Sequence, residues 1–285
     1  MGAINSGTTA LFDVLLTPFD AMGQEWSLLL VSGVFGILAL IAFKHISYQK
    51  GIKSAKDRIK GHLIEIRIYQ DDLAVVGKSI GKILLRNGQY VGLNFGPFIP
   101  LMIPFVLVLA QFVVRYAFTP AAIQDPAAVV LAGEGTTFSV QMAAGHGSDV
   151  EGLTIEYPVG VAAVSPLVRS IGSGAAWQEI VATAPGVHVI TLRLADGTSE
   201  TKLFAAGDVA PRQMQPERVQ GIEAILWPAE APLASDSAFA RVTCAYPDGE
   251  LGWLPGSGVL GVLLVFLVAS MAFGAAVLKP LGIQI

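Results

Sequence analysis

The chain is poor in cysteine and in charge. Cys244 is the only cysteine among 285 residues, so no disulfide can form within the chain and each folded part must be held by its own core. Charged residues make up 14% of the sequence and hydrophobic residues 53%. Because a soluble domain usually carries about 25% charged residues, this composition indicates a membrane protein.

Motifs for catalysis and metal binding are also missing. The sequence has no glycine-rich phosphate loop followed by lysine, no Gly-x-Ser-x-Gly element and no cysteine pair. The four histidines fall in separate regions, at His45, His62, His146 and His188. We therefore expect no catalytic residue, no metal and no cofactor, and we do not expect an enzyme.

Three apolar stretches are long enough to cross a bilayer, since a hydrocarbon core of about 30 Å needs about 20 helical residues. They cover residues 26–43, 95–118 and 254–278. The start of the second stretch is crowded by three prolines, Pro97, Pro100 and Pro104. Because proline lacks a backbone donor, we expect this start to be kinked or irregular.

Charge is distributed unequally between the two segments that join these stretches. Residues 44–94 carry ten basic and four acidic residues, whereas residues 119–253 carry six basic and fifteen acidic residues. Because positive charge resists translocation, the first segment is predicted to be cytoplasmic and the second to lie outside. The N-terminus is then outside and the tail, residues 279–285, inside. The lack of presequence features favours a bacterial inner membrane.

The N-terminal segment, residues 1–25, precedes the first apolar stretch. Residues 10–19 combine apolar side chains with an acid and end near Pro18, and they are too short to cross. This pattern predicts a short interfacial helix on the outer surface. A flexible tail is the alternative.

The cytoplasmic segment is predicted to form a helical hairpin. Its apolar residues are spaced by three or four, at Ile52, Ala55, Ile59, Leu63, Ile66, Tyr69, Leu73, Val76, Ile80 and Ile83, which is typical of an apolar helix face. Asp71 or Asp72 would cap a second helix; a cation site at these two acids is the alternative. Basic residues occupy the other face, at Lys53, Lys56, Arg58, Lys60, Arg67, Lys78, Lys82 and Arg86. Two partners suit that face: anionic lipid headgroups, or RNA and the ribosome.

The outer segment is predicted to be rich in strands. Asp-Gly and Pro-Gly turns separate short strands, which favours an immunoglobulin-like sandwich. The candidate strands cover residues 129–131, 137–140, 153–157, 179–182, 187–194 and 201–204, with one or two more around 221–227 and 239–246. The expected fold class is thus a three-span helical bundle with a cytosolic hairpin and an extracytoplasmic all-β domain, to which an outer partner protein could bind.

Arg115 is the one ionisable residue within the apolar stretches, and Gln111 lies one turn before it. One interpretation is that Arg115 snorkels to the outer surface or to Glu25. In the other, Arg115, Gln111 and Ser32 line a polar groove between the helices.

This arrangement resembles a known family. An outer N-terminus, a first span, a basic cytosolic hairpin, a second span that starts with the proline-rich sequence of residues 96–104, and a third span that ends inside are similar to the three-helix core of the YidC/Oxa superfamily. The likeness is greatest to the branch that contains the archaeal homologues and the insertase subunit of the ER membrane complex. It covers residues 8–118 and 254–280. The outer β domain is not part of the family's minimal core, and the family's groove arginine usually lies in the first core helix, where this chain has none.

The resemblance implies an insertase-like or chaperone-like protein that moves short polar flanks of client proteins across the bilayer without nucleotide. Nascent membrane proteins or the ribosome would then meet the hairpin. A non-catalytic envelope scaffold, or an accessory subunit of a membrane complex, is the alternative. A transporter is a poorer match, because three spans without charged residues at the midplane offer no substrate site unless the protein forms an oligomer.

Overall fold

The structure is a computed structural model that describes residues 2–19, 22–129, 131, 133–208 and 213–283. The chain divides into two units. The sheet unit comprises Met1–Leu28 and Leu107–Val265, and the hairpin unit comprises Leu29–Val106 and Phe266–Ile285.

Three helical stretches are long and apolar enough to cross a membrane, in agreement with the sequence. They are α2 (Gln24–Ile46), the stretch Leu73–Tyr116 and α6 (Gly258–Leu281). The middle stretch consists of α4 (Leu73–Phe95) and α5 (Phe98–Tyr116), separated by a turn at Gly96-Pro97. This turn confirms the predicted irregularity, and it lies where proline cannot continue the hydrogen-bond ladder of α4.

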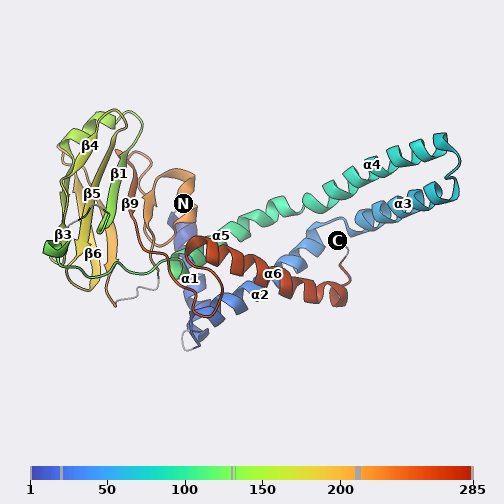
Figure 1. Ribbon diagram of the computed structural model, residues 1–285, viewed down its shortest axis with the longest axis horizontal. Coiled ribbons are helices and arrows are strands. Elements are labelled where there is room, and N and C mark those ends of the chain that lie inside the picture. Colours follow the sequence, from blue (N-terminus) through green and yellow to red (C-terminus); the bar gives the residue numbers. More distant parts are fainter. Residues whose placement is uncertain (1, 20–21, 130, 132, 209–212, 284–285) are drawn as a thin grey trace. The chain divides into compact units, whose positions relative to one another are not determined.

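The predicted hairpin is confirmed as a pair of helices. Helix α3 (Gln49–Ile68) and helix α4 lie side by side, and Figure 1 shows them joined at one end by a tight turn. The Asp72 carboxylate accepts hydrogen bonds from the backbone N–H groups of Ala74 (3.0 Å) and Val75 (3.2 Å). Asp72 is therefore the N-cap that starts the second helix.

In the hairpin unit, aromatic rings fill the space where α2, α5 and α6 meet. The Phe266 ring centroid lies 5.2 Å from that of Phe35 and 5.0 Å from that of Phe105. Beside this cluster α2 and α6 approach closely, because a Cβ added at Gly36 would collide with the backbone of Ser270. Glycine in a membrane helix allows this kind of backbone contact.

A second apolar cluster lies at the base of the hairpin. Phe43 at the end of α2, Ile52 at the start of α3 and Ile283 after α6 are buried together, with Tyr90 and Leu101 packed against them. The cluster ties the hairpin helices to the cytoplasmic ends predicted for the spans.

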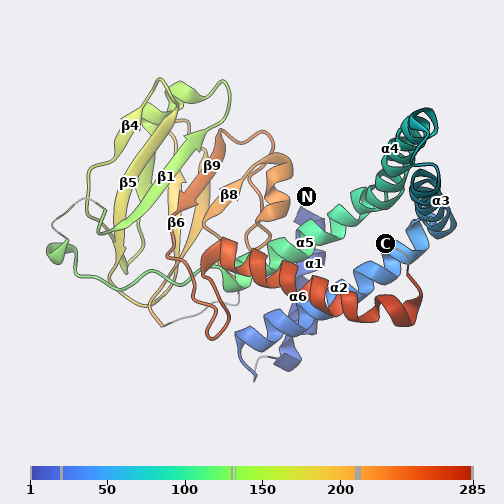
Figure 2. The same cartoon turned by 45° about the vertical axis from the view of Figure 1, so that its right-hand side comes forward.

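The sheet unit begins with α1 (Gly2–Leu16) and the 3₁₀ turn η1 (Thr17–Phe19). Its strands form two antiparallel sheets, one in the order β3-β5-β1-β9-β8, with β4 also paired to β5, and the other in the order β2-β6-β7. Figure 2 shows β4, β5, β1, β9 and β8 as one layer. The strands are β1 (Thr136–Met142), β2 (Thr154–Glu156), β3 (Val161–Ala163), β4 (Val168–Ser170), β5 (Ala175–Ala182), β6 (Gly186–Arg193), β7 (Ser199–Ala206), β8 (Glu217–Val219) and β9 (Phe239–Cys244).

One hydrophobic core joins the two sheets. Phe138 and Val140 of β1 are buried in the same cluster as Ile190 of β6 and Phe204 of β7. Cys244 lies in this core, and burial raises the pKa of its thiol to about 12. The single cysteine thus acts as a buried apolar side chain.

The strand predictions were mostly confirmed in the described residues, with two exceptions. Residues 221–227 are not a strand: Gly221–Leu226 forms the 3₁₀ helix η4, which starts at Gly221 with a φ of 69° that an extended strand does not allow. The strand expected at 129–131 falls partly outside the described residues, and Pro126–Ala128 just before it forms the 3₁₀ turn η2.

Candidate functional site

A polar cluster lies where α1 meets the end of α5. Arg115 donates a hydrogen bond from Nη2 to Oδ1 of Asp13 (2.8 Å), and Gln111 donates from Nε2 to Oγ1 of Thr9 (2.9 Å). Edge-to-face packing of Phe12 on Phe112 closes one side of the cluster, with 5.7 Å between ring centroids. The two polar side chains of the otherwise apolar helix α5, Gln111 and Arg115, therefore bind polar groups of α1.

Burial makes the Arg115 contacts unusual. Its side chain is 5% exposed, whereas that of Asp13 is 37% exposed. Arg115 forms its ion pair with Asp13 and not with the predicted Glu25. Snorkelling of Arg115 to a membrane surface remains a prediction. Among the described residues, the buried Nε of Arg115 has no hydrogen-bond partner. A buried N–H without a partner costs about 1–3 kcal/mol.

Two of the three predicted groove residues share a unit. Gln111 and Arg115 belong to the sheet unit, and both are buried. Ser32 belongs to the hairpin unit, where it is fully buried in α2. A groove formed by all three remains a prediction.

Helix α4 presents two apolar faces. One packs on α3 and includes the buried Ser79 and the partly buried Ile83. The opposite face follows steps of four and three residues and is exposed throughout, at Gly77, Gly81, Leu84, Gly88, Val91 and Phe95. Leu84 is 67% exposed, and a Cβ added at any of Gly77, Gly81, Gly88 or Gly92 would meet nothing within 4 Å. We call this the outer face of α4. In a segment that lies in water, a contiguous exposed apolar face marks an interaction site.

Most of the predicted basic residues of the hairpin have exposed side chains. Those exposed are Lys53, Arg58, Lys60, Arg67 and Lys78, and those partly buried are Lys56, Lys82 and Arg86. Glu65 lies between the two helices: it pairs with His62 (2.9 Å) and lies 3.9 Å from Lys82. The His62 hydrogen bond, with a smaller contribution from the Lys82 charge, lowers the pKa of the Glu65 carboxyl. The outer face of α4 carries none of these charges.

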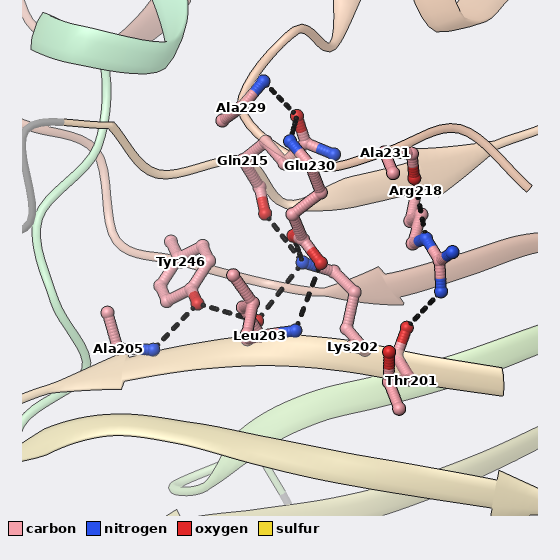
Figure 3. Close-up of polar contacts among 10 residues, drawn as sticks. All are labelled: Thr201, Lys202, Leu203, Ala205, Gln215, Arg218, Ala229, Glu230, Ala231 and Tyr246. Atoms are coloured by element: carbon pink, nitrogen blue, oxygen red, sulfur yellow. Dashed lines mark hydrogen bonds and ion pairs between the residues drawn. The ribbon is translucent and has the colours of Figure 1, made fainter. Parts of the chain in front are cut away.

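The sheet unit contains a buried ion pair that the sequence did not suggest. Lys202 of β7 is fully buried and pairs with Glu230. Its ammonium group also donates to the carbonyl oxygens of Gln215 (2.9 Å) and Leu203 (3.1 Å). Figure 3 shows these groups converging on the Lys202 nitrogen. Since all three ammonium protons have acceptors, the cluster is a structural one.

The same cluster closes the free edge of β7. Glu230 accepts a hydrogen bond from the Leu203 N–H (3.0 Å), and the Tyr246 hydroxyl accepts one from the Ala205 N–H (2.9 Å) and donates to the Leu203 carbonyl (Figure 3). Arg218 binds the Thr201 carbonyl. Side chains thus occupy the backbone groups that a further strand would use.

The outer surface of the larger sheet carries a shallow hollow of about 370 Å³. Trp177 of β5 lies in its wall, 41% exposed, beside the apolar side chains of Leu131, Pro166 and Val168. Ser165, Gln178 and Glu179 add polar groups to the lining. An exposed tryptophan in a hollow that combines apolar and polar groups is typical of a contact surface.

Within the described residues, no three His, Cys, Asp or Glu side chains are grouped as a metal site would require. Comparisons of the chain with protein-family models, with curated proteins and with solved structures returned no match.

Proposed function

We propose that this protein is an insertase-like or chaperone-like membrane protein that helps apolar client segments enter the bilayer, without an enzymatic step or a cofactor. The observation that carries the proposal is the outer face of α4. It is apolar and exposed, and it lies on a hairpin whose other helix is strongly basic.

The glycines of this face suit an apolar helix as the bound segment. An α-helix can approach a glycine-lined helix closely, because no Cβ keeps the backbones apart. The three glycines of this face, Gly77, Gly81 and Gly88, alternate with Leu84 and Val91 in heptad-like steps, which is the spacing of a helix–helix contact. The basic residues of α3 would bind the anionic lipid surface, or the phosphates of a ribosome that delivers the client.

The energetic task would be to reduce the cost of moving polar flanks through hydrocarbon, about 2.5–3.5 kcal/mol per charge on insertion scales. Membership of the YidC/Oxa superfamily, with the outer N-terminus and inner hairpin that the charge distribution predicts, is part of this proposal. A location in a bacterial inner membrane is also part of this proposal.

The test is site-specific photocrosslinking in cells that produce short-tailed membrane proteins. Probes at Leu84 and Val91 on the outer face are expected to capture many nascent clients. A probe at Lys60, exposed on α3, is the matched control. Leu84→Glu places a charge on the face and should abolish capture from Val91. A single discrete partner at Leu84, or lipid alone, would overturn the proposal.

The alternative, an envelope scaffold, is favoured by one observation, the Trp177 hollow. If the outer domain is an immunoglobulin-like sandwich that binds a partner protein there, a stable complex should be recovered with the full-length chain. Trp177→Ala should release that partner, and Ile222→Ala, at an exposed site elsewhere in the same domain, should not.

A further inference from the structure

Helix α1 covers the polar pair of α5. Within the described part of the chain, Gln111 Nε2 donates hydrogen bonds to two hydroxyls, both of α1, at Thr8 (3.2 Å) and Thr9 (2.9 Å). The ion pair of Arg115 is likewise with α1, through Asp13. Removing α1 would leave the amide and the guanidinium, on an otherwise apolar helix, with the long hydrogen bond from Arg115 Nη2 to Gln111 Oε1 (3.4 Å) in place of their α1 partners.

The fit of α1 to this site is incomplete. Asp13 binds only the Nη2 atom of Arg115, and Nε stays buried without a partner in the described part of the chain. Guanidinium groups bind carboxylates best through two parallel N–H···O bonds. A carboxylate placed to accept from both Nε and Nη2 would satisfy the donor that Asp13 leaves unpaired.

Asp13 is also in a position to leave. Its side chain is 37% exposed, so water can solvate the carboxylate once the ion pair opens. The remaining contacts of α1 include the Phe12–Phe112 packing and a hydrogen bond from Asn5 Nδ2 to the Ala224 carbonyl (2.7 Å). The Oδ1 atom of Asn5 is buried without a partner in the described chain. Two unsatisfied buried polar atoms at the α1 contacts weaken its attachment.

We propose that α1 is a displaceable lid over a carboxylate-binding site formed by Arg115 and Gln111, opened when an acidic polypeptide segment replaces Asp13. This inference deepens the proposed function, because it gives the site a ligand class and a closed state. The lid itself can be tested without any client insertion.

The reporter is a single cysteine on α1 in the full-length protein, reconstituted in phosphatidylcholine vesicles. Leu16 is buried and Leu15 beside it is exposed, so Leu16→Cys reports opening and Leu15→Cys is the matched control. The native Cys244 is fully buried, and its raised thiol pKa keeps it unreactive at neutral pH. The readout is the rate of labelling by a water-soluble maleimide.

Asp13→Asn should speed labelling at position 16 about tenfold, the factor that corresponds to about 1.4 kcal/mol, and leave position 15 unchanged. With Asp13 in place, an apolar helical peptide that ends in aspartates should have the same effect, whereas its asparagine counterpart should not. Arg115→Gln should remove the difference between the two peptides.

Equal effects of the two peptides, or no response of position 16 to Asp13→Asn, would overturn the lid. The proposed function can fail separately: displacement of α1 by the peptide together with no client crosslinks at Leu84 would keep the lid and reject the insertase. Client crosslinks at Leu84, together with no displacement of α1 by the peptide, would keep the insertase and reject the lid.

Discussion

The buried pair Lys202–Glu230 offers the sharpest prediction about stability. Lys202 is 0% exposed and Glu230 is 8% exposed, so neither charge can turn to water when its partner is lost. Glu230→Ala leaves the ammonium group with two carbonyl acceptors and removes the acceptor of the Leu203 N–H. Removing one member of a buried pair costs about 3–5 kcal/mol, and we expect a loss of that size.

The measurement is denaturant unfolding of the detergent-solubilised full chain, followed by tryptophan fluorescence. Arg193→Ala is the matched control, because its pair with Glu156 lies in the same domain with both side chains more than half exposed. That variant should lose less than about 1 kcal/mol.

A double variant separates the unpaired charge from lost packing. Lys202→Met combined with Glu230→Ala removes both charges, so it should be more stable than Glu230→Ala alone. If Glu230→Ala costs no more than Arg193→Ala, or if the double variant is the less stable of the two, then the pair does not hold the domain in the way described.

Three further outcomes are expected. Gly36→Val should disrupt the packing of α2 on α6 at Ser270 and lower the yield of folded protein in detergent. Gly61→Ala, where an added Cβ meets nothing within 4 Å, should instead stabilise α3 by up to about 1 kcal/mol. Equal yields of the two variants would contradict the close approach of α2 to α6. Asp72→Ala should cost about 1 kcal/mol, seen as faster hydrogen exchange in the first turn of α4 and unchanged exchange in α3. The Cys244 thiol, whose pKa rises from 9.0 to about 12 on folding, contributes stability that is complete below pH 9 and is lost as the pH rises towards 12. The unfolding free energy should fall by up to about 4 kcal/mol across that range, and Cys244→Ala should lack this part of the slope.

Periodicity identified the helices but not all of their faces. The spacing of Ile59, Val76 and Ile83 predicted one continuous apolar stripe, and these residues do lie partly buried in the hairpin. Leu63, Tyr69, Leu73 and Ile80 were assigned to the same stripe, yet all four are exposed. A count of apolar residues at steps of three and four cannot separate two apolar faces on one helix, because the glycines between them carry no hydropathy signal.

Contacts between distant parts of the chain were beyond sequence reasoning. Asp13 lies 102 residues from Arg115, so nothing local marks it as the partner, and Glu25 was the nearer acid to the first span. The Lys202–Glu230 pair was missed for a similar reason, since a lysine in an alternating strand is expected to point to water. The short strands β3, β4 and β8 have three residues each, too few for an alternation to appear.

The closed edge of β7 limits how the β domain can assemble. A partner chain that added a strand there would first have to break the bonds from Leu203 to Glu230 and from Ala205 to Tyr246, and so expose the charge of Lys202. Growth of this sheet into a larger one, whether in a complex or in an aggregate, is therefore blocked on that side by the domain's own core.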